Sequence, residues 1–235
     1  MSEPRRFLTA RWSRLAMLNY EMDPAILRAL VPSGTELDTW NGRCFASMVG
    51  FQFLDTRVLG VAVPFHRNFL EVNLRFYVRR GVDGEIRRGV VFVKELVPRR
   101  ALAWVANAVY NEHYVALPMW SEDAGDRVAY SWKYRRKPCS LGVSVMGDSY
   151  AAEPDSEESF ITEHYWGYVS QRDGATVEYK VEHPTWRVWR GVDSSFDCDV
   201  AGLYGAEFAA PLSGKPSSCF LADGSEVVVR MGVRF

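Results

Sequence analysis

The chain has 235 residues and a formal net charge of −1, with 28 Lys and Arg against 29 Asp and Glu. Its 48% hydrophobic and 14% aromatic content excludes a disordered chain. The balanced charge creates no positive field for nucleic acid or an anionic membrane, so we expect neither partner. No apolar segment follows residues 1–6, and no run approaches the roughly 18 residues of a membrane span. We therefore expect a single domain over residues 1–235, located in the cytoplasm.

The motifs of the common cofactor and metal sites are missing from the sequence. The four cysteines are dispersed, which favours reduced thiols over a zinc ribbon or a disulfide framework. Neither glycine-rich phosphate-binding motif occurs, and no Gly-x-Ser-x-Gly is present. The four histidines show no metal-binding spacing. We predict no cofactor and no metal.

The first elements are marked by strong local signals. Asp23 and Pro24 predict the start of a helix that continues to Leu30, because Asp caps free backbone N–H groups and proline fits the first turn. Asn41-Gly42, between the strand-like segments 35–40 and 43–49, predicts a hairpin. Both turn residues tolerate positive φ, so the two segments should pair.

Residues 70–79 alternate between apolar and polar side chains and form the clearest predicted strand. A turn at residues 81–84 leads into residues 88–96, whose apolar centre is typical of a strand covered on both faces. Residues 101–109 have the spacing of a helix that packs against the sheet.

The second half of the chain consists mainly of predicted strands. We predict them at residues 128–134, 141–145, 163–170, 176–181, 185–189 and 226–233, with a weak helix at 199–208. Strands in hairpin pairs favour a mainly antiparallel α+β fold with a few flanking helices over a doubly wound sheet.

Motifs in a fixed order extend from about residue 11 to about residue 190. They occupy residues 11–12, 19–24, 31–38, 69–78, 89–93, 110–114, 164–168 and 182–184. Together they resemble the uncharacterised YqjF-like family, which is grouped with the acetoacetate decarboxylase-like superfamily. The resemblance implies a closed, cone-like antiparallel barrel with an interior pocket.

The enzyme that gives this superfamily its name forms a Schiff base through a lysine. In its relatives that lysine lies in a Pro-Lys-Lys stretch, and here Glu112-His113-Tyr114 stands in its place, with no lysine between Lys94 and Lys133. Decarboxylation by that mechanism is therefore not expected. The resemblance also implies that Glu71 is an active-site carboxylate. It places an active-site arginine within residues 11–14 and leaves the choice between two arginines, Arg11 and Arg14, open.

Glu71, Asn73 and Arg75 share the polar face of the predicted strand. They point either to solvent, which is common for antiparallel strands, or into the barrel, where they could hold a polar ligand at low dielectric. Glu112, His113 and Tyr114 could bind or polarise that ligand, or else simply end a helix. Trp166 could line an aromatic pocket or belong to a packed core.

Lys94 could be a Schiff-base lysine at a different position in the sequence. A lysine on such a strand more often forms an ion pair, here with Glu95, or reaches solvent at the end of the strand.

The leading hypothesis is a small-molecule-binding barrel for an anionic or carbonyl-containing ligand, with no Schiff base. Glu71, His113 and Tyr114 would be catalytic if the protein is an enzyme. The residues proposed to hold the ligand are Arg11, Asn73, Arg75, Glu112 and Trp166. The alternative is a non-catalytic ligand-binding or assembly protein on the same scaffold. Whether the chain forms a homo-oligomer is left open.

Overall fold

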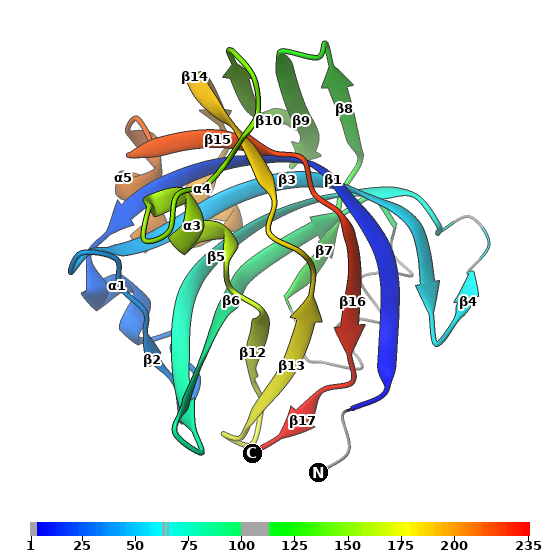
Figure 1. Cartoon of the computed structure of the whole chain (residues 1–235). Coiled ribbons are helices and arrows are strands. Elements are labelled where there is room, and N and C mark those ends of the chain that lie inside the picture. The colour runs from blue at the N-terminus through cyan, green and yellow to red at the C-terminus, as the bar shows by residue number, and fades with distance from the viewer. Residues whose placement is uncertain (1–3, 63, 65, 100–112) are drawn as a thin grey trace.

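A closed ring of strands forms the centre of the structure (Figure 1). The computed structural model describes residues 4–62, 64, 66–99 and 113–235. Each strand of the ring pairs with the next and the last pairs with the first, in the order β1 (Arg6–Met22), β3 (Cys44–Val58), β5 (Phe69–Val82), β6 (Glu85–Val97), β12 (Trp166–Ser170), β13 (Thr176–Glu182) and β16 (Glu226–Arg230). Among these pairings of described ring strands, the one between β6 and β12 is parallel and the others are antiparallel. The predicted mainly antiparallel fold with a few helices is confirmed.

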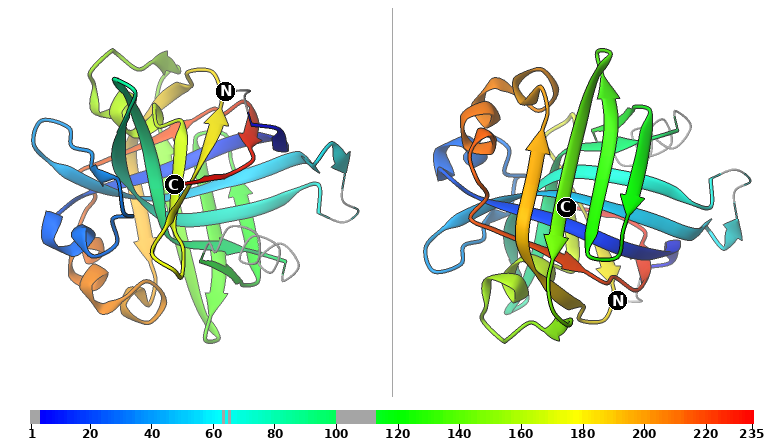
Figure 2. Two further views of the ribbon diagram at one scale, coloured as in Figure 1. Left: turned by 90° about the horizontal axis from the view of Figure 1, so that it is seen from below. Right: turned by 90° about the horizontal axis from the view of Figure 1, so that it is seen from above.

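A second layer of strands covers the outer face of β1, β3 and β5 (Figure 2). It consists of β8 (Met119–Asp123), β9 (Arg127–Tyr134), β10 (Lys137–Val145) and β14 (Arg187–Asp197). The long strand β14 also pairs with β15 (Ser218–Ala222), which in turn pairs with β1. This continuous hydrogen bonding fixes the second layer against the ring.

Short elements complete the described part of the chain. The helices are α1 (Pro24–Arg28), α3 (Glu157–Thr162), α4 (Val200–Leu203) and α5 (Ala206–Ser213). The short strands are β2 (Glu36–Leu37), β4 (Val61–Ala62), β7 (Tyr114–Ala116), β11 (Tyr150–Ala151) and β17 (Val233–Arg234). Of these, β7 and α3 carry residues that bear on the site.

Two apolar clusters lie on opposite faces of the ring strands. The outer cluster joins Leu18, Met48 and Leu74 of the ring to Tyr130 and Leu141 of the second layer. The inner cluster is rich in aromatic residues and includes Phe45, Phe51, Tyr77, Phe160, Trp186 and Phe220. The ring strands are thus covered on both faces, so polar residues on their inner face are enclosed as well.

The contact between ring and second layer is close at Gly50 on β3. A Cβ atom there would lie 2.4 Å from Cδ2 of Tyr130 and 2.9 Å from Cδ2 of Leu141. We expect Gly50→Ala to lower the free energy of unfolding by about 1–3 kcal/mol, because two packed side chains must move. Urea denaturation measures this difference.

Gly81→Ala is the matched control for Gly50→Ala. Gly81 lies on β5, and a Cβ atom there would meet no atom of the described residues within 4 Å. We expect this variant to change stability by less than about 0.5 kcal/mol. Equal effects of the two substitutions would contradict close packing at Gly50.

Most local predictions agree with the structure. Asp23 caps α1 by accepting a hydrogen bond from the backbone N of Ala25 at 2.8 Å. Residues 41 and 42 form a turn with positive φ, closed by the pairing of Trp40 with Arg43. The predicted hairpin is wrong in one respect, because β2 pairs with β5 and not with β3. The predicted helix at 101–109 lies outside the described residues.

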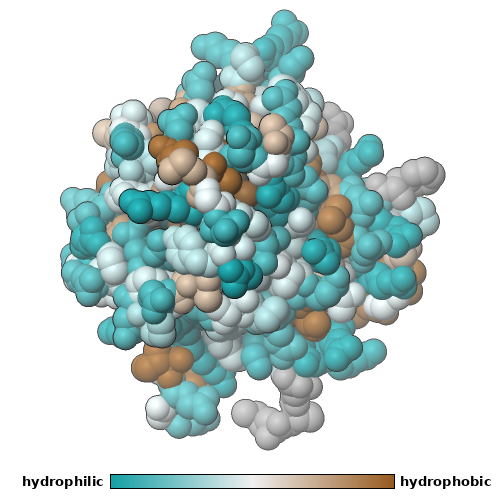
Figure 3. Space-filling view, turned by 45° about the horizontal axis from the view of Figure 1, so that its top comes forward, coloured by the Kyte–Doolittle hydropathy of each residue, from teal (hydrophilic) through white to brown (hydrophobic). Residues whose placement is uncertain are grey.

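The face shown in Figure 3 is mainly hydrophilic, and its apolar residues form small separate groups. None of the helices in the described part of the chain has the length and apolar character needed to span a membrane. Scattered apolar residues are normal on a protein surface and mark no site. The interior of the ring, by contrast, contains the features of a candidate site.

Candidate functional site

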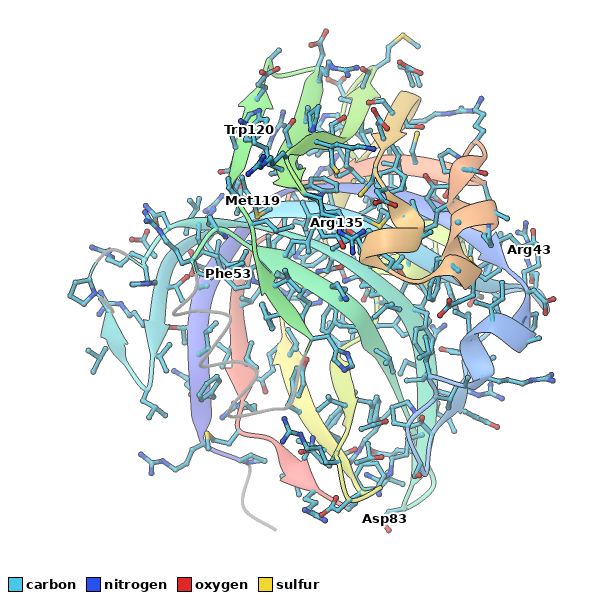
Figure 4. All side chains as sticks on the ribbon, turned by 180° about the vertical axis from the view of Figure 1, so that it is seen from behind. Arg43, Phe53, Asp83, Met119, Trp120 and Arg135 are labelled. Atoms are coloured by element: carbon cyan, nitrogen blue, oxygen red, sulfur yellow. The ribbon has the colours of Figure 1, made fainter. Side chains whose placement is uncertain are left out.

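The interior of the ring contains a cavity of about 180 Å³. Its walls are mainly apolar and include Trp12, Phe51, Phe53, Phe69, Phe92 and Trp186. Figure 4 shows Phe53 on the ring, Met119 and Trp120 on β8 beyond one end, and Asp83 at the tip of the hairpin at the other end. A concave, mainly apolar cavity with a few polar groups is typical of a small-molecule site.

Strand β5 supplies the polar part of the wall. Glu71, Asn73 and Arg75 line the cavity and are 2%, 1% and 8% exposed. The intervening Val72 and Leu74 belong to the outer apolar cluster, so alternation along the strand turns the polar face inward. The second layer makes this orientation necessary, because it buries the opposite face.

A β-bulge in β6 adds Glu95 to this wall. Asn73 lies opposite Glu95 and Arg75 lies opposite Phe92, so the partner strand has one more residue than β5 between these pairs. Both Phe92 and Glu95 line the cavity, although regular alternation would place them on opposite faces. Lys94 lies opposite Leu74 and does not line the cavity.

Glu71 has a perturbed pKa. Burial raises its pKa to about 7, against the opposing effects of two hydrogen bonds and the charge of Arg75. Asn73 Nδ2 donates to Oε1 at 3.0 Å, and the hydroxyl of Tyr114 on β7 donates to Oε2 at 3.3 Å. A carboxyl group that titrates near neutral pH can give or take a proton under physiological conditions.

The pKa of His164, which follows α3 and lines the cavity, is shifted in the opposite direction to that of Glu71. Nε2 of His164 lies 3.1 Å from Oδ2 of Asp38, and Nε of Arg88 lies 2.7 Å from the same oxygen. Burial lowers the pKa of His164 to about 4, although the hydrogen bond to Asp38 favours the charged form. Burial alone would raise the pKa of Asp38, but hydrogen bonds from His164 and Arg88 hold it below its ordinary value. His164 is therefore neutral and Asp38 ionised at neutral pH.

Four buried polar atoms of the cavity wall have no hydrogen-bond partner among the residues that the structure describes. They are two donors, Nε1 of Trp12 and Nε of Arg75, and two acceptors, Oδ1 of Asn73 and Nδ1 of His164. Burying an unpaired polar atom costs about 1–3 kcal/mol, so a group of such atoms on one wall calls for an explanation. Similar atoms occur singly elsewhere in the described residues, but four of them gather on this wall, which makes the cavity the candidate site.

The aromatic side of the cavity contains a second histidine, His183. Its ring stacks on Trp186 with centroids 4.1 Å apart, and burial lowers its pKa. Its Nδ1 lies 2.9 Å from the carbonyl oxygen of Pro184, so Nδ1 carries the proton and Nε2 is the acceptor. His183 therefore contributes mainly the flat face of its ring to the cavity wall.

The structure brings five of the eight residues singled out from the sequence to one cavity. Glu71, Asn73, Arg75, Tyr114 and Trp166 all line it.

Arg11 and His113 require a correction, because both are exposed and neither lines the cavity. Their neighbours Trp12 and Tyr114 point inward, and adjacent residues of a strand point to opposite faces. Arg14 is not the missing arginine either, because its Nη2 lies 2.6 Å from Oδ1 of Asp123 and it is absent from the cavity wall. Glu112 lies outside the described residues.

Neither a cavity role for Glu95 nor the pairing of His164 with Asp38 was predicted from the sequence. Glu95 stands beside Lys94 in the sequence, which favoured an ion pair between them. Asp38 and His164 are 126 residues apart, and no local pattern connects them. The His164-x-Trp166 alternation was the one available signal for an inward-facing histidine.

None of the cavity-lining residues in the described part of the chain is a lysine. Residues 1–3, 63, 65 and 100–112 contain no lysine in the sequence. A Schiff base with a cavity lysine therefore has no candidate residue in this chain. Among the described residues there is also no group of three or more His, Cys, Asp or Glu that could hold a metal ion.

Comparisons with known proteins agree with the predicted resemblance. The family model described as "DUF2071: Uncharacterized conserved protein" matches residues 9–226. The uncharacterized protein YqjF of Bacillus subtilis (strain 168) is 32% identical over 178 residues, which cover 74% of this chain and 72% of YqjF.

Two similar solved structures concern enzymes. An acetoacetate decarboxylase from Legionella pneumophila has a TM-score of 0.67 at 14% identity and covers 100% of this chain and 90% of its own. The enduracididine biosynthesis enzyme MppR complexed with pyruvate has a TM-score of 0.67 at 15% identity and covers 100% and 91%. At these identities the likeness establishes the fold alone.

Proposed function

Because the chain belongs to the DUF2071 family of uncharacterized conserved proteins, whose activity its fold does not define, we propose a function from the cavity itself. The protein binds a small molecule that carries a carboxylate or carbonyl group, and Glu71 exchanges a proton with it. The observation that carries this proposal is the polar face of β5, with Glu71 and Arg75 buried on the wall of a mainly apolar cavity.

Arg75 is the group that would hold an anion. Its Nη2 donates to the carbonyl oxygen of Ile161 at 3.3 Å, while its Nε has no partner among the described residues. A guanidinium can bind a carboxylate through two parallel hydrogen bonds, and such bonds are strong where water is excluded. The aromatic walls leave room for an apolar body on the ligand.

The raised pKa of Glu71 supports a role of this residue in proton transfer. A pKa of about 7 leaves both protonation states populated near neutral pH, which suits a general acid or base. Protonation of a ligand carbonyl by Glu71, or removal of a proton next to that carbonyl, needs no covalent link to the protein. This chemistry is compatible with a cavity wall that lacks lysine in the described residues.

One of the solved structures with the same fold contains pyruvate, a small oxo acid. That likeness in fold supports an oxo acid as the ligand of this chain, which is also the class that a guanidinium and a carboxyl group on one wall would bind. The carbonyl and carboxylate of an oxo acid would be neighbours in the ligand. Glu71 and Arg75 are likewise close enough for the charge of Arg75 to lower the pKa of Glu71.

A second candidate function is binding without catalysis. Both carboxyl oxygens of Glu71 already accept hydrogen bonds, one from Asn73 and one from Tyr114. A carboxyl group held in this way can shape a binding site without transferring a proton. The two candidates share the ligand class and differ only in turnover.

Binding of 3-phenylpropanoate and phenylpyruvate tests the shared part of the proposal. Both acids should quench the fluorescence of the cavity tryptophans, whereas uncharged 3-phenylpropanamide should bind weakly. Arg75→Gln should weaken acid binding about ten- to a hundredfold, because a charge-assisted hydrogen bond is lost. Arg11→Gln makes the same change at an exposed arginine outside the cavity wall and should leave affinity unchanged. Equal affinities in the two variants would refute Arg75 as the anion site.

Deuterium exchange distinguishes catalysis from binding. Phenylpyruvate in D₂O should exchange the protons next to its carbonyl faster with the protein than without it, as followed by NMR. Glu71→Gln should remove this acceleration while the acid still binds, because glutamine cannot transfer a proton. Glu122→Gln, at an exposed glutamate on β8, is the control. Binding with no acceleration in the wild-type protein would favour the non-catalytic function.

A further inference from the structure

The cavity presents two neutral hydrogen-bond acceptors close to its cation. Oδ1 of Asn73 and Nδ1 of His164 are both buried on the cavity wall without a partner among the described residues. His164 is 7% exposed and Asn73 is 1% exposed, so bulk water does not satisfy either atom. A ligand that carried only a carboxylate would satisfy Arg75 and leave both acceptors unpaired.

The role of His164 as an acceptor follows from its partner. Asp38 is an ionised carboxylate and can only accept, so Nε2 of His164 must be the donor in their 3.1 Å hydrogen bond. Since the ring is neutral, its Nδ1 carries a free lone pair. Arg88, which binds the same oxygen of Asp38, fixes the carboxylate and through it the orientation of the ring.

Arg75 and His164 both lie near the ring of Tyr77, and Arg75 is close enough to His164 for its charge to act on the histidine. The guanidinium carbon of Arg75 is 5.7 Å from the centre of the Tyr77 ring, and the ring of His164 is 4.7 Å from it. Asn73 is two residues before Arg75 on the same face of β5. One small ligand can therefore reach the cation and an acceptor at once.

We propose that His164 is a binding residue of this cavity and that it selects ligands with a hydroxyl group next to the carboxylate, that is, hydroxy acids with an apolar body. The inference rests on the proposed function, since it assumes that Arg75 holds the carboxylate. The hydroxyl donates its proton to Nδ1 of His164, and its oxygen remains available to the donors of the wall. An ammonium group in the same place would bring a second positive charge close to Arg75, which disfavours amino acids.

The test compares three ligands that share one skeleton: 3-phenyllactate, 3-phenylpropanoate and phenylalanine. Calorimetric titration of the full chain should show 3-phenyllactate binding about tenfold more tightly than 3-phenylpropanoate, because the hydroxyl satisfies a buried acceptor. Phenylalanine should bind more weakly than 3-phenyllactate. Equal affinities of the first two acids, or tighter binding of phenylalanine, would overturn the inference and leave the proposed function standing. If neither acid binds, the proposed function itself fails.

Two substitutions of His164 assign the preference to Nδ1. Asparagine places a carbonyl oxygen near the position of Nδ1, so His164→Asn should keep most of the preference for 3-phenyllactate. Glutamine reaches toward Asp38 and leaves the position of Nδ1 without an acceptor, so His164→Gln should bring the ratio of the two affinities to about one. Because the ratio is measured within one protein, a loss of stability does not change its meaning. A glutamine variant that keeps the tenfold ratio would show that His164 is not the acceptor.

Discussion

Replacing Asp38 with alanine should lower the free energy of unfolding by about 3 kcal/mol. The side chain of Asp38 is 4% exposed and joins His164 to Arg88 through one oxygen. His164 is 1% exposed at its side chain, so its Nε2–H would lose its partner with no water to replace it, which alone costs about 1–3 kcal/mol. The charge-assisted hydrogen bond from Arg88 is lost as well. Urea denaturation at pH 7 measures the change.

The control for Asp38→Ala is Glu36→Ala. Glu36 lies two residues earlier and pairs with Arg79 at 2.8 Å, but the two side chains are 67% and 44% exposed. Exposed ion pairs contribute little, so we expect a change of less than about 1 kcal/mol. Similar losses in the two variants would mean that the burial of the Asp38 pair has no energetic importance.

The sequence predicted that residues 70–79 form the strand that carries the candidate polar residues. It did not show whether their face points to solvent or into the cavity, and the structure explains why. The alternation in β5 separates Glu71, Asn73 and Arg75 from the apolar residues between them. Alternation shows that two faces differ and is silent on what covers each one. Here the second layer of strands covers the apolar face, and that layer comes from residues 119–145 and 187–197.

Irregular strands explain why several features of the fold and the site have no clear sequence pattern. β1 is 17 residues long and was not predicted, because its register against β3 shifts between Thr9 and Arg11 and again between Ser13 and Ala16. Each shift changes which face a residue occupies, so no continuous period of two remains. The bulge in β6 conceals Glu95 in the same way.

The pair of His164 and Asp38 could not be predicted for a different reason. Asp38 follows β2, whose pairing with β5 replaces the hairpin that the Asn41-Gly42 turn indicated. The backbone N of Asp38 donates to the carbonyl oxygen of Tyr77 at 3.0 Å, which places its carboxylate beside the inner face of the ring. The pairing of β2 with β5 thus decided the position of Asp38, although the local sequence indicated pairing with residues 43–49.

Glu71→Gln should change how stability depends on pH. The folded protein has a Glu71 pKa of about 7 against an ordinary value of 4.5. Below pH 4.5 both states bind the proton, and the stabilising contribution is fully present. Between pH 4.5 and about 7 the unfolded chain has released a proton that the folded protein keeps, so the contribution falls by about 1.4 kcal/mol per pH unit as pH rises. We expect the wild-type protein to lose about 3 kcal/mol relative to Glu71→Gln across this interval.

The difference between the two proteins is the quantity to measure, because His164 opposes Glu71 in the wild-type curve. The pKa of His164 is lowered from 6.5 to about 4, so its contribution to the free energy of unfolding is lost as pH falls from 6.5 to about 4. This change partly cancels the pH dependence that Glu71 produces. His164 is present in both proteins and cancels in the difference. Urea denaturation of both proteins from pH 4.5 to 8 gives that difference, and Glu122→Gln should show no pH-dependent difference from the wild type. A flat difference for Glu71→Gln would mean that the carboxyl group is ionised in the folded protein at neutral pH, and its role as a proton donor would have to be abandoned.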